Sequence, residues 1–268
     1  MKSSALPLPA SVRASVESAL GERPAEEQFA WMSWAGTVWR LAADGRVVYV
    51  KRAAHLEGER DRLAWLAGRW PVPETIGFFH ELGDDWLVTH AVRGVPMYDP
   101  SVGWVPDRVA ATLGAILRDL HATDAGDCPF GEKRAGHVLV HGDYCLPNVL
   151  VEEGKLSALV DVGQTGLGNP EIDLAAGVWT LQYNYGPGFA RTFLDAYGWP
   201  PMSDAAIEKL RRKYNSSPFM GRWRPKGAGG AASKSAGLWS PRPASSTRRR
   251  SSGKDGISRP RPSGPSAR

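Results

Sequence analysis

Residues 138–161 read VLVHGDYCLPNVLVEEGKLSALVD, and the alternation of apolar runs and polar residues here is the strongest indication of the architecture. The stretch begins with the apolar run Val138–Val140, which stops at a polar loop. Within that loop, Asn148 follows Asp143 by five residues, and β-rich sequence resumes directly afterwards. The order predicts a short strand, a loop with two polar side chains, and further strands.

The residues after this loop predict a β-hairpin. Two β-rich runs, Val149–Glu152 and Leu156–Val160, flank a turn that we place at Gly154-Lys155. In an antiparallel pair with this turn, Asn148 lies opposite Asp161. A turn one residue earlier would shift the pairing by two residues. In both cases an amide and a carboxylate emerge together at the open end of the hairpin.

Oxygen-bearing side chains gathered in this way suit phosphoryl-transfer chemistry. Asn148 and Asp161 offer the oxygen ligands that Mg²⁺ prefers, and a nearby carboxylate such as Asp143 can accept a hydroxyl proton. Singly, these residues have plainer interpretations as a turn former, a loop cap and a helix cap. We expect His141 to fix the loop through a hydrogen bond and Cys145 to be a small packed residue.

The same residues carry a family resemblance. HGDYCLPNVLV and the later VDVGQTGLGNPEIDLA resemble the catalytic and metal segments of aminoglycoside phosphotransferases, especially the 3′ type. The resemblance implies a kinase-like fold that moves the γ-phosphate of ATP onto a hydroxyl of an aminoglycoside. It implies Asp143 as the base that orients this hydroxyl, Asn148 and Asp161 as Mg²⁺ ligands, and Asp173 as a buried brace of the catalytic loop.

The N-terminal half contains a matching pair of charges. Lys51 ends the β-rich run VVYVK, and Glu59 lies in the helical pattern of residues 56–68. Taken alone, both would be exposed surface charges. The resemblance implies that Lys51 neutralises the α- and β-phosphates and that Glu59 holds it through an ion pair. Glu57 is a rival partner, but the family's spacing to Trp65-Leu66 selects Glu59.

An adenine site is also implied by the resemblance. Tyr49 matches the family's aromatic residue that stacks on adenine, although an ordinary strand tyrosine is the plainer interpretation. The run Leu87–Val92 resembles the hinge between the lobes, where backbone groups of His90 and Val92 would bind the adenine edge. WMSWAGTVWRL offers only Gly36, so the glycine-rich loop of protein kinases is missing.

A strand-rich first half and a helical second half predict an α+β chain with two lobes. We expect a small β-rich nucleotide-binding lobe at 1–90 and a larger helical catalytic and substrate lobe at 91–215. The expected elements are helices at 9–20, 56–68 and 106–122, and strands at 37–41, 47–51, 76–80 and 86–89, with a turn at 83–85 between the last two.

Composition separates the last part of the chain from the rest. Of 268 residues, 42% are apolar, which is enough for a substantial core, and the net charge is +5. Residues 216–268 hold twelve Lys or Arg, one acid, and 27 Gly, Pro or Ser, so we expect a disordered basic tail. Arg248–Arg250 could tether a polyanion, but we expect no nucleic-acid contact. Two cysteines and short apolar runs predict a cytoplasmic protein without a membrane span.

The sequence departs from the resembled family at three places. Gln164 stands where an Arg is common, only twelve residues separate Cys128 from His141, and the family's last acidic residues are absent after Tyr214. Two alternatives therefore accompany the aminoglycoside interpretation. One is a kinase of the same superfamily for another small molecule, and the other is an inactive kinase-like protein with a polyanion-binding tail.

Overall fold

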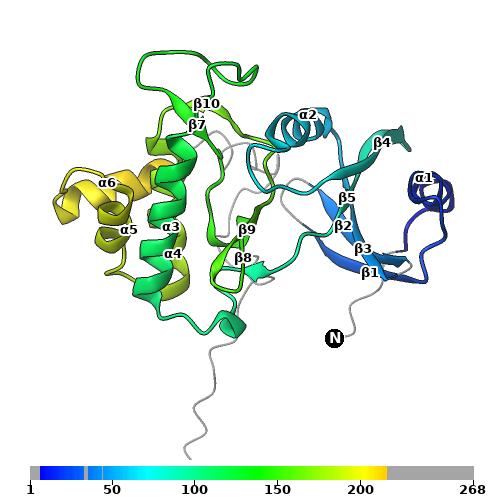
Figure 1. The fold of residues 1–268 in the computed structure, drawn as a ribbon, viewed down its shortest axis with the longest axis horizontal. Helices are drawn as coiled ribbons and strands as arrows, with labels where there is room; N and C mark the ends of the chain where they lie inside the picture. The colour runs from blue at the N-terminus through cyan, green and yellow to red at the C-terminus, as the bar shows by residue number, and fades with distance from the viewer. Residues whose placement is uncertain (1–6, 33–35, 44, 216–268) are drawn as a thin grey trace, which may run out of the picture. The chain divides into compact units, whose positions relative to one another are not determined.

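The computed structural model describes residues 7–32, 36–43 and 45–215. Within them, a β-rich N-terminal lobe precedes a helical C-terminal lobe, which confirms the predicted α+β, kinase-like architecture (Figure 1). The tail expected to be disordered, residues 216–268, lies outside the described residues.

The N-terminal lobe is built on one antiparallel sheet of five strands in the order β1-β2-β3-β5-β4. Each predicted strand of this lobe is present, and β1 is an addition. The strands are β1 (Glu26–Met32), β2 (Thr37–Ala43), β3 (Arg46–Ala53), β4 (Thr75–Glu81) and β5 (Asp84–His90).

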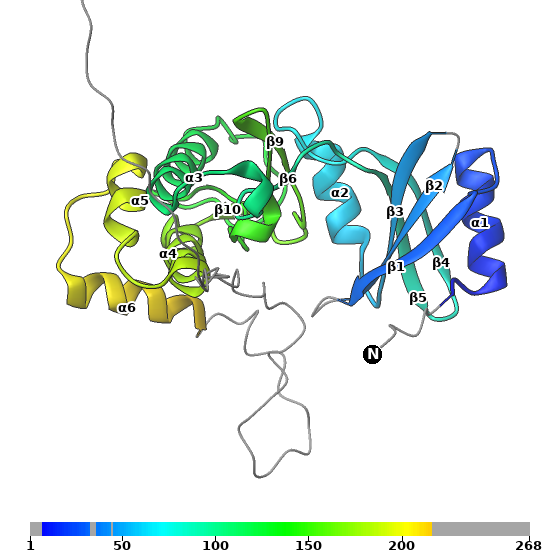
Figure 2. The same ribbon diagram turned by 90° about the horizontal axis from the view of Figure 1, so that it is seen from below.

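Helices α1 (Ala10–Leu20) and α2 (Glu57–Leu66) lie on opposite faces of this sheet (Figure 2). Successive strand residues point to opposite faces, so each helix packs against alternate positions. The α1 face buries Val48, Val50, Trp86 and Val88 with Val12 and Val16 of the helix. The α2 face buries Ala53 and Leu87 with Leu63 and Leu66 of the helix.

The C-terminal lobe surrounds helix α3 (Pro106–His121), which begins with a proline as predicted. Its apolar stripe is buried at Val109, Leu113, Leu117 and Leu120, and Ile116 is half-buried. The other helices are α4 (Glu171–Tyr185), α5 (Ala190–Tyr197) and α6 (Asp204–Asn215). Short elements complete the lobe: β6 (Val95–Pro96), η1 (Pro100–Val102), β7 (Val138–Val140), η2 (Leu146–Asn148), β8 (Val149–Glu152), β9 (Lys155–Leu159) and β10 (Gly166–Gly168).

Gly114 allows α3 and α5 to approach closely, and this yields a stability prediction. A Cβ at this position would lie 2.2 Å from the backbone oxygen of Phe193. We expect Gly114→Ala to lower the free energy of unfolding by about 2 kcal/mol, because the two helices must separate. Urea unfolding measures the change. The matched control is Gly58→Ala in α2, where a Cβ meets only the flexible end of Arg62 and stability should hold. Equal effects in both variants would contradict the prediction.

The predicted turn at residues 83–85 is wrong by one residue. Asp84 already pairs with Glu81, so the loop consists of Leu82 and Gly83. Both have positive φ, at 55° and 81°. Two-residue hairpin loops adopt this conformation because it matches the twist of the flanking strands.

The β8–β9 hairpin turns one residue earlier than the preferred prediction, at the alternative position considered above, and its register differs from both. The loop consists of Glu153 and Gly154, both with positive φ, so Glu152 pairs with Lys155. This turn alone would place Asn148 opposite Leu159, but a bulge beside Leu150 moves the pairing back by one residue. As a result Asn148 lies opposite Val160, whose N–H donates to the Asn148 carbonyl at 3.0 Å. Asp161 follows one residue beyond this pair.

Candidate active site

Asp173, in the first turn of α4, holds the loop between β7 and η2. This carboxylate is fully buried. One oxygen accepts from the N–H of His141 at 2.6 Å, and the other accepts from the N–H of Gly142 at 2.8 Å. The loop backbone therefore has its shape fixed by a side chain 31 residues further along the chain.

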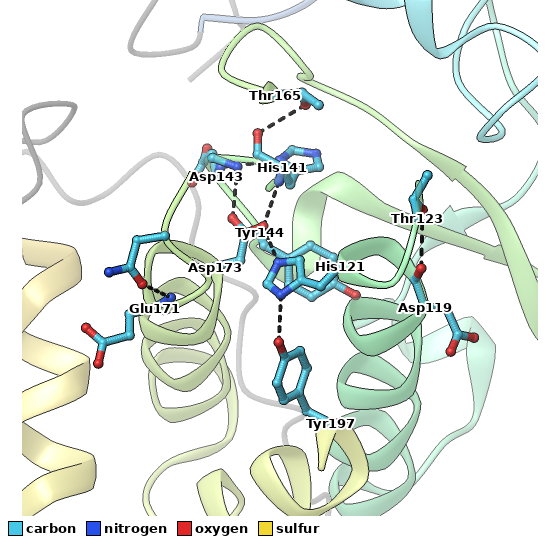
Figure 3. A network of polar contacts seen from close by, with 12 residues as sticks. Asp119, His121, Thr123, His141, Asp143, Tyr144, Thr165, Glu171, Asp173 and Tyr197 are labelled. Atoms are coloured by element: carbon cyan, nitrogen blue, oxygen red, sulfur yellow. Dashed lines mark hydrogen bonds and ion pairs between the residues drawn. The ribbon is translucent and has the colours of Figure 1, made fainter. Parts of the chain in front are cut away.

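Asp173 is itself positioned by a buried histidine of α3. His121 Nε2 lies 3.1 Å from the carboxylate, and His121 Nδ1 lies 2.9 Å from the hydroxyl of Tyr197. Figure 3 shows Tyr197, His121 and Asp173 following one another toward His141. Three helices of the lobe thus contribute to a single polar chain that ends at the loop. This geometry agrees with the expected brace.

His141 links the loop to the segment before Asp161. Its Nδ1 accepts from the Asp143 N–H at 3.3 Å, so its Nε2 carries the proton and donates to the Val160 carbonyl at 3.0 Å. With both ring nitrogens engaged and the side chain fully buried, His141 fixes the loop as predicted. Gly142 has φ +89°, and a Cβ there would lie 2.7 Å from the Gln164 carbonyl, so this position requires glycine.

Asn148 is oriented by Asp143. Its Nδ2 donates to the Asp143 carbonyl at 2.9 Å and to the carboxylate oxygen Oδ2 of the same residue at 3.2 Å. Because both partners are acceptors, the nitrogen must face them and the side-chain oxygen must face away. The five-residue spacing therefore produces a carboxylate and an oppositely directed amide oxygen.

Lys51 joins the two lobes through two ion pairs. Its Nζ lies 2.6 Å from Oε2 of Glu59 in α2 and 2.8 Å from Oδ1 of Asp161. The ammonium is therefore bound to Glu59, as the sequence predicts over Glu57. The Asp161 contact was not predicted. Burial alone would lower the pKa of Lys51, but the two carboxylates outweigh it and raise this pKa above its usual value.

Asp161 has an unusual backbone for a residue with a side chain. Its φ of +58° places it in the left-handed region, and its carboxylate is 44% exposed. Such a conformation costs on the order of 1 kcal/mol and is often found at functional sites. Burial of part of the group favours its neutral form, but Lys51 prevails and lowers the pKa of Asp161. The Asp161 carboxylate therefore stays ionised, and part of it is accessible to solvent.

The residues expected around adenine lie on or next to the same sheet. Tyr49 is half-buried and shares a face of β3 with Lys51, two residues away. His90 ends β5, and its N–H already donates to the Glu74 carbonyl, so only its carbonyl could take part in binding a base. No backbone carbonyl within the described ranges accepts from the Val92 N–H.

Comparison with known proteins agrees with this geometry. Residues 28–136 and 132–211 match the phosphotransferase enzyme family. The chain belongs to this family. An aminoglycoside 3′-phosphotransferase from Streptomyces ribosidificus is 32% identical over 226 residues, which cover 60% of this phosphotransferase and 83% of the relative. The resemblance inferred from the two sequence motifs is thereby confirmed.

Solved structures give the same result for the fold. A crystal structure of a type VIII aminoglycoside 3′-phosphotransferase is 26% identical, with a TM-score of 0.62, and the match covers 77% of this phosphotransferase and all of that chain. An aminoglycoside phosphotransferase from Streptomyces rimosus, in complex with ADP and streptomycin, is 21% identical with a TM-score of 0.60, over 75% and 94% of the two chains. No described helix of this phosphotransferase has the length and apolar character needed to cross a membrane.

The donor atoms of this phosphotransferase fit a hard divalent cation. The outward amide oxygen of Asn148 and the partly open carboxylate of Asp161 are both oxygen ligands. Mg²⁺ is bound by few protein oxygens and keeps other positions for water or phosphate. The Oδ2 atom of Asp143 faces the amide nitrogen of Asn148, on the opposite side of that side chain from its amide oxygen. Asp143 is therefore not one of the two proposed metal ligands.

A second group of potential ligands lies at the start of α2. Atoms of His55, Glu57 and Asp85 come within 4.8 Å of one another. Asp85, however, accepts from the Leu56 N–H at 2.8 Å and lies 3.0 Å from His80 Nδ1. These bonds tie Asp85 to His80 and to the backbone just before α2, the helix that carries Glu59.

Two contacts to the catalytic loop escaped sequence reasoning. Tyr214 of α6 reaches Asp143, and the hydroxyl of Thr165 donates to the His141 carbonyl at 3.2 Å. Nothing in the local sequence indicates either contact, because both partners are distant in the chain. Cys145 is buried as expected, and burial raises the pKa of its thiol well above the usual value.

Proposed function

We propose that this protein transfers the γ-phosphate of ATP to the 3′-hydroxyl of an aminoglycoside. The observation that carries the proposal is the arrangement around Lys51. One ammonium binds both Glu59 and Asp161. Asp161 lies two residues after β9, and Asn148, which is hydrogen-bonded to Asp143, directly precedes the partner strand β8. This arrangement provides places for a nucleotide, a metal and a hydroxyl at one site.

Asp143 is the proposed base. Its Oδ2 accepts the proton of the substrate hydroxyl as the hydroxyl oxygen attacks the γ-phosphorus. The bond from this phosphorus to the bridging oxygen of ADP breaks, and ADP leaves with the electron pair. Because little covalent chemistry falls to the protein, the rate depends on how well Asp143 and the phosphates are positioned.

The nucleotide is held mainly by the N-terminal lobe in this proposal, with 1–90 as nucleotide-binding lobe and 91–215 as catalytic and substrate lobe. Lys51 neutralises the α- and β-phosphates, and Tyr49 stacks on the adenine. The His90 carbonyl and the Val92 N–H bind the adenine edge. Asn148 and Asp161 would hold Mg²⁺, which supplies further charge neutralisation when bound.

Charge supports a cationic substrate. Residues 1–215 carry more acidic than basic side chains, and an acidic protein surface raises the local concentration of a polycation such as an aminoglycoside. The relative from Streptomyces ribosidificus carries the 3′-phosphotransferase name. Two free cysteines further favour a reducing, cytoplasmic setting.

The proposal is tested by ATP turnover with a matched pair of antibiotics. Kanamycin B and tobramycin differ only in the 3′-hydroxyl, which tobramycin lacks. We expect the full chain to release ADP with kanamycin B and Mg²⁺, and to release none above background with tobramycin. Equal turnover would exclude the 3′ position. No turnover with any aminoglycoside, but turnover with another alcohol, would assign a different substrate class.

A change at Lys51 tests the nucleotide assignment separately. We expect Lys51→Met to lower kcat/KM for ATP on the order of 100-fold, because one side of the phosphates loses its counter-charge. The measurement is coupled ADP release over a range of ATP concentrations. Lys155→Met, at the exposed end of β9, is the matched control and should leave turnover unchanged. An unchanged kcat/KM in Lys51→Met would remove Lys51 from the site.

A further inference from the structure

A tyrosine from the last described helix contacts the proposed base directly. The hydroxyl of Tyr214 donates to Oδ1 of Asp143 at 2.7 Å. The two residues are 71 positions apart, and the contact forms because α6 packs against α4 beside the catalytic loop. Hydrogen bonds to an ionised carboxylate are short and stronger than those between neutral groups.

The ring of Tyr214 is held in place by an aromatic stack. Trp179 of α4 packs against it, with 4.9 Å between ring centroids, and Tyr183 packs against Trp179 with a 5.1 Å separation. Burial and the neighbouring Cys145 and Asp143 raise the pKa of Tyr214 well above its usual value. The hydroxyl therefore remains a proton donor at neutral pH.

The partners of the Asp143 carboxylate divide its two oxygens into different roles. Oδ1 accepts from the Tyr214 hydroxyl. The Sγ of Cys145 lies 3.3 Å from the Tyr214 hydroxyl oxygen and 3.4 Å from Oδ1, and its one proton can be donated to only one of them. Oδ2 accepts from the Asn148 amide at 3.2 Å. The bond from Tyr214 is shorter than the bond from Asn148, so Oδ1 is the oxygen held more tightly, whereas Oδ2 keeps a lone pair for a further donor.

We propose that Tyr214 is a positioning residue that fixes the Asp143 carboxylate so that Oδ2 faces the substrate hydroxyl. The inference rests on the proposed function, in which Asp143 is the base. Without the tyrosine hydroxyl, the carboxylate can rotate and Oδ2 spends less time in the productive orientation. The same contact gives α6 a direct influence on the rate of transfer.

Kinetics of Tyr214→Phe test this role, because the substitution removes only the hydroxyl and keeps the stacked ring. We expect kcat to fall about tenfold, with KM for ATP and for the antibiotic within twofold of wild type. A merely structural role would move the melting temperature without this split. Tyr183→Phe, which removes a hydroxyl from the other, 55% exposed end of the stack, is the control and should match wild type.

Two kinetic outcomes would count against the inference. An unchanged kcat in Tyr214→Phe would show that the hydroxyl does not position the base. An increased kcat would show that the tyrosine blocks the substrate site. If the wild-type chain transfers no phosphate to any aminoglycoside, the proposed function fails, and a second measurement still decides the contact.

That measurement is a double-mutant cycle on stability, with Tyr214→Phe, Asp143→Ala and the combined variant unfolded in urea. If the hydroxyl binds the carboxylate, the combined variant shifts the midpoint by less than the sum of the single shifts. Additive shifts would overturn the inference regardless of turnover.

Discussion

Asp161→Ala is expected to lower kcat by about 1,000-fold or more, so that phosphate transfer is almost abolished. The substitution removes one of the two proposed Mg²⁺ ligands and one of the two carboxylates that hold the Lys51 ammonium. Effects of this size are typical when a charge that stabilises phosphoryl transfer is removed. Coupled ADP release under saturating ATP and antibiotic measures the change.

A closely matched control exists for this variant. Asp61 in α2 is similarly exposed, at 49% against 44% for Asp161, and it also pairs with a basic side chain, Arg60. Asp61→Ala should therefore keep full activity. Lys51 still binds Glu59 in Asp161→Ala, so the fold should persist and thermal unfolding should change little. Full activity in Asp161→Ala would contradict the assignment of this residue to the site.

The largest effect on stability is expected for Asp173→Ala. This substitution leaves the N–H groups of His141 and Gly142 buried without an acceptor and removes the partner of His121 Nε2. Each unsatisfied buried group costs about 1–3 kcal/mol, so we expect a loss of about 4 kcal/mol in the free energy of unfolding. For a chain of this size, the melting temperature should fall by about 10 °C.

The control for Asp173→Ala is an aspartate on the surface of α3. Asp119 is 62% exposed and pairs with the adjacent Arg118, an arrangement that contributes little to stability. Asp119→Ala should unfold within 1 °C of wild type. Equal melting temperatures in Asp173→Ala and wild type would show that the loop does not depend on the buried carboxylate.

The architecture and many site residues could be predicted because the signals are local. Alternation along VVYVK places Tyr49 and Lys51 on one face of a strand, and the 3.6-residue period of α2 turns Leu63 inward. The five-residue spacing of Asp143 and Asn148 is read directly from the sequence and corresponds to a real hydrogen bond. The choice of Glu59 over Glu57 came from family spacing, and the ion pair with Lys51 has the same partner.

The register of strand pairing was harder to predict than the positions of the strands and helices. The β8–β9 hairpin was expected to place Asn148 opposite Asp161, but an earlier turn and a bulge beside Leu150 together make Val160 its partner. A bulge adds one residue to one strand, and its position depends on packing and not on strand propensity. The left-handed backbone conformation of Asp161, one residue beyond this pair, could likewise not be predicted from the sequence.

Residue types and periodicities of two and 3.6 residues are enough to predict which oxygen and nitrogen groups are available, and on which strand, helix or loop each lies. The contacts that each group makes depend on how these elements pack. The packing of the helices brings Asp173 into contact with the loop, His121 into contact with Asp173, and Tyr214 into contact with Asp143. These contacts join residues 31 to 71 positions apart, so they depend on how separate helices pack together. No periodic pattern in the sequence indicates such contacts.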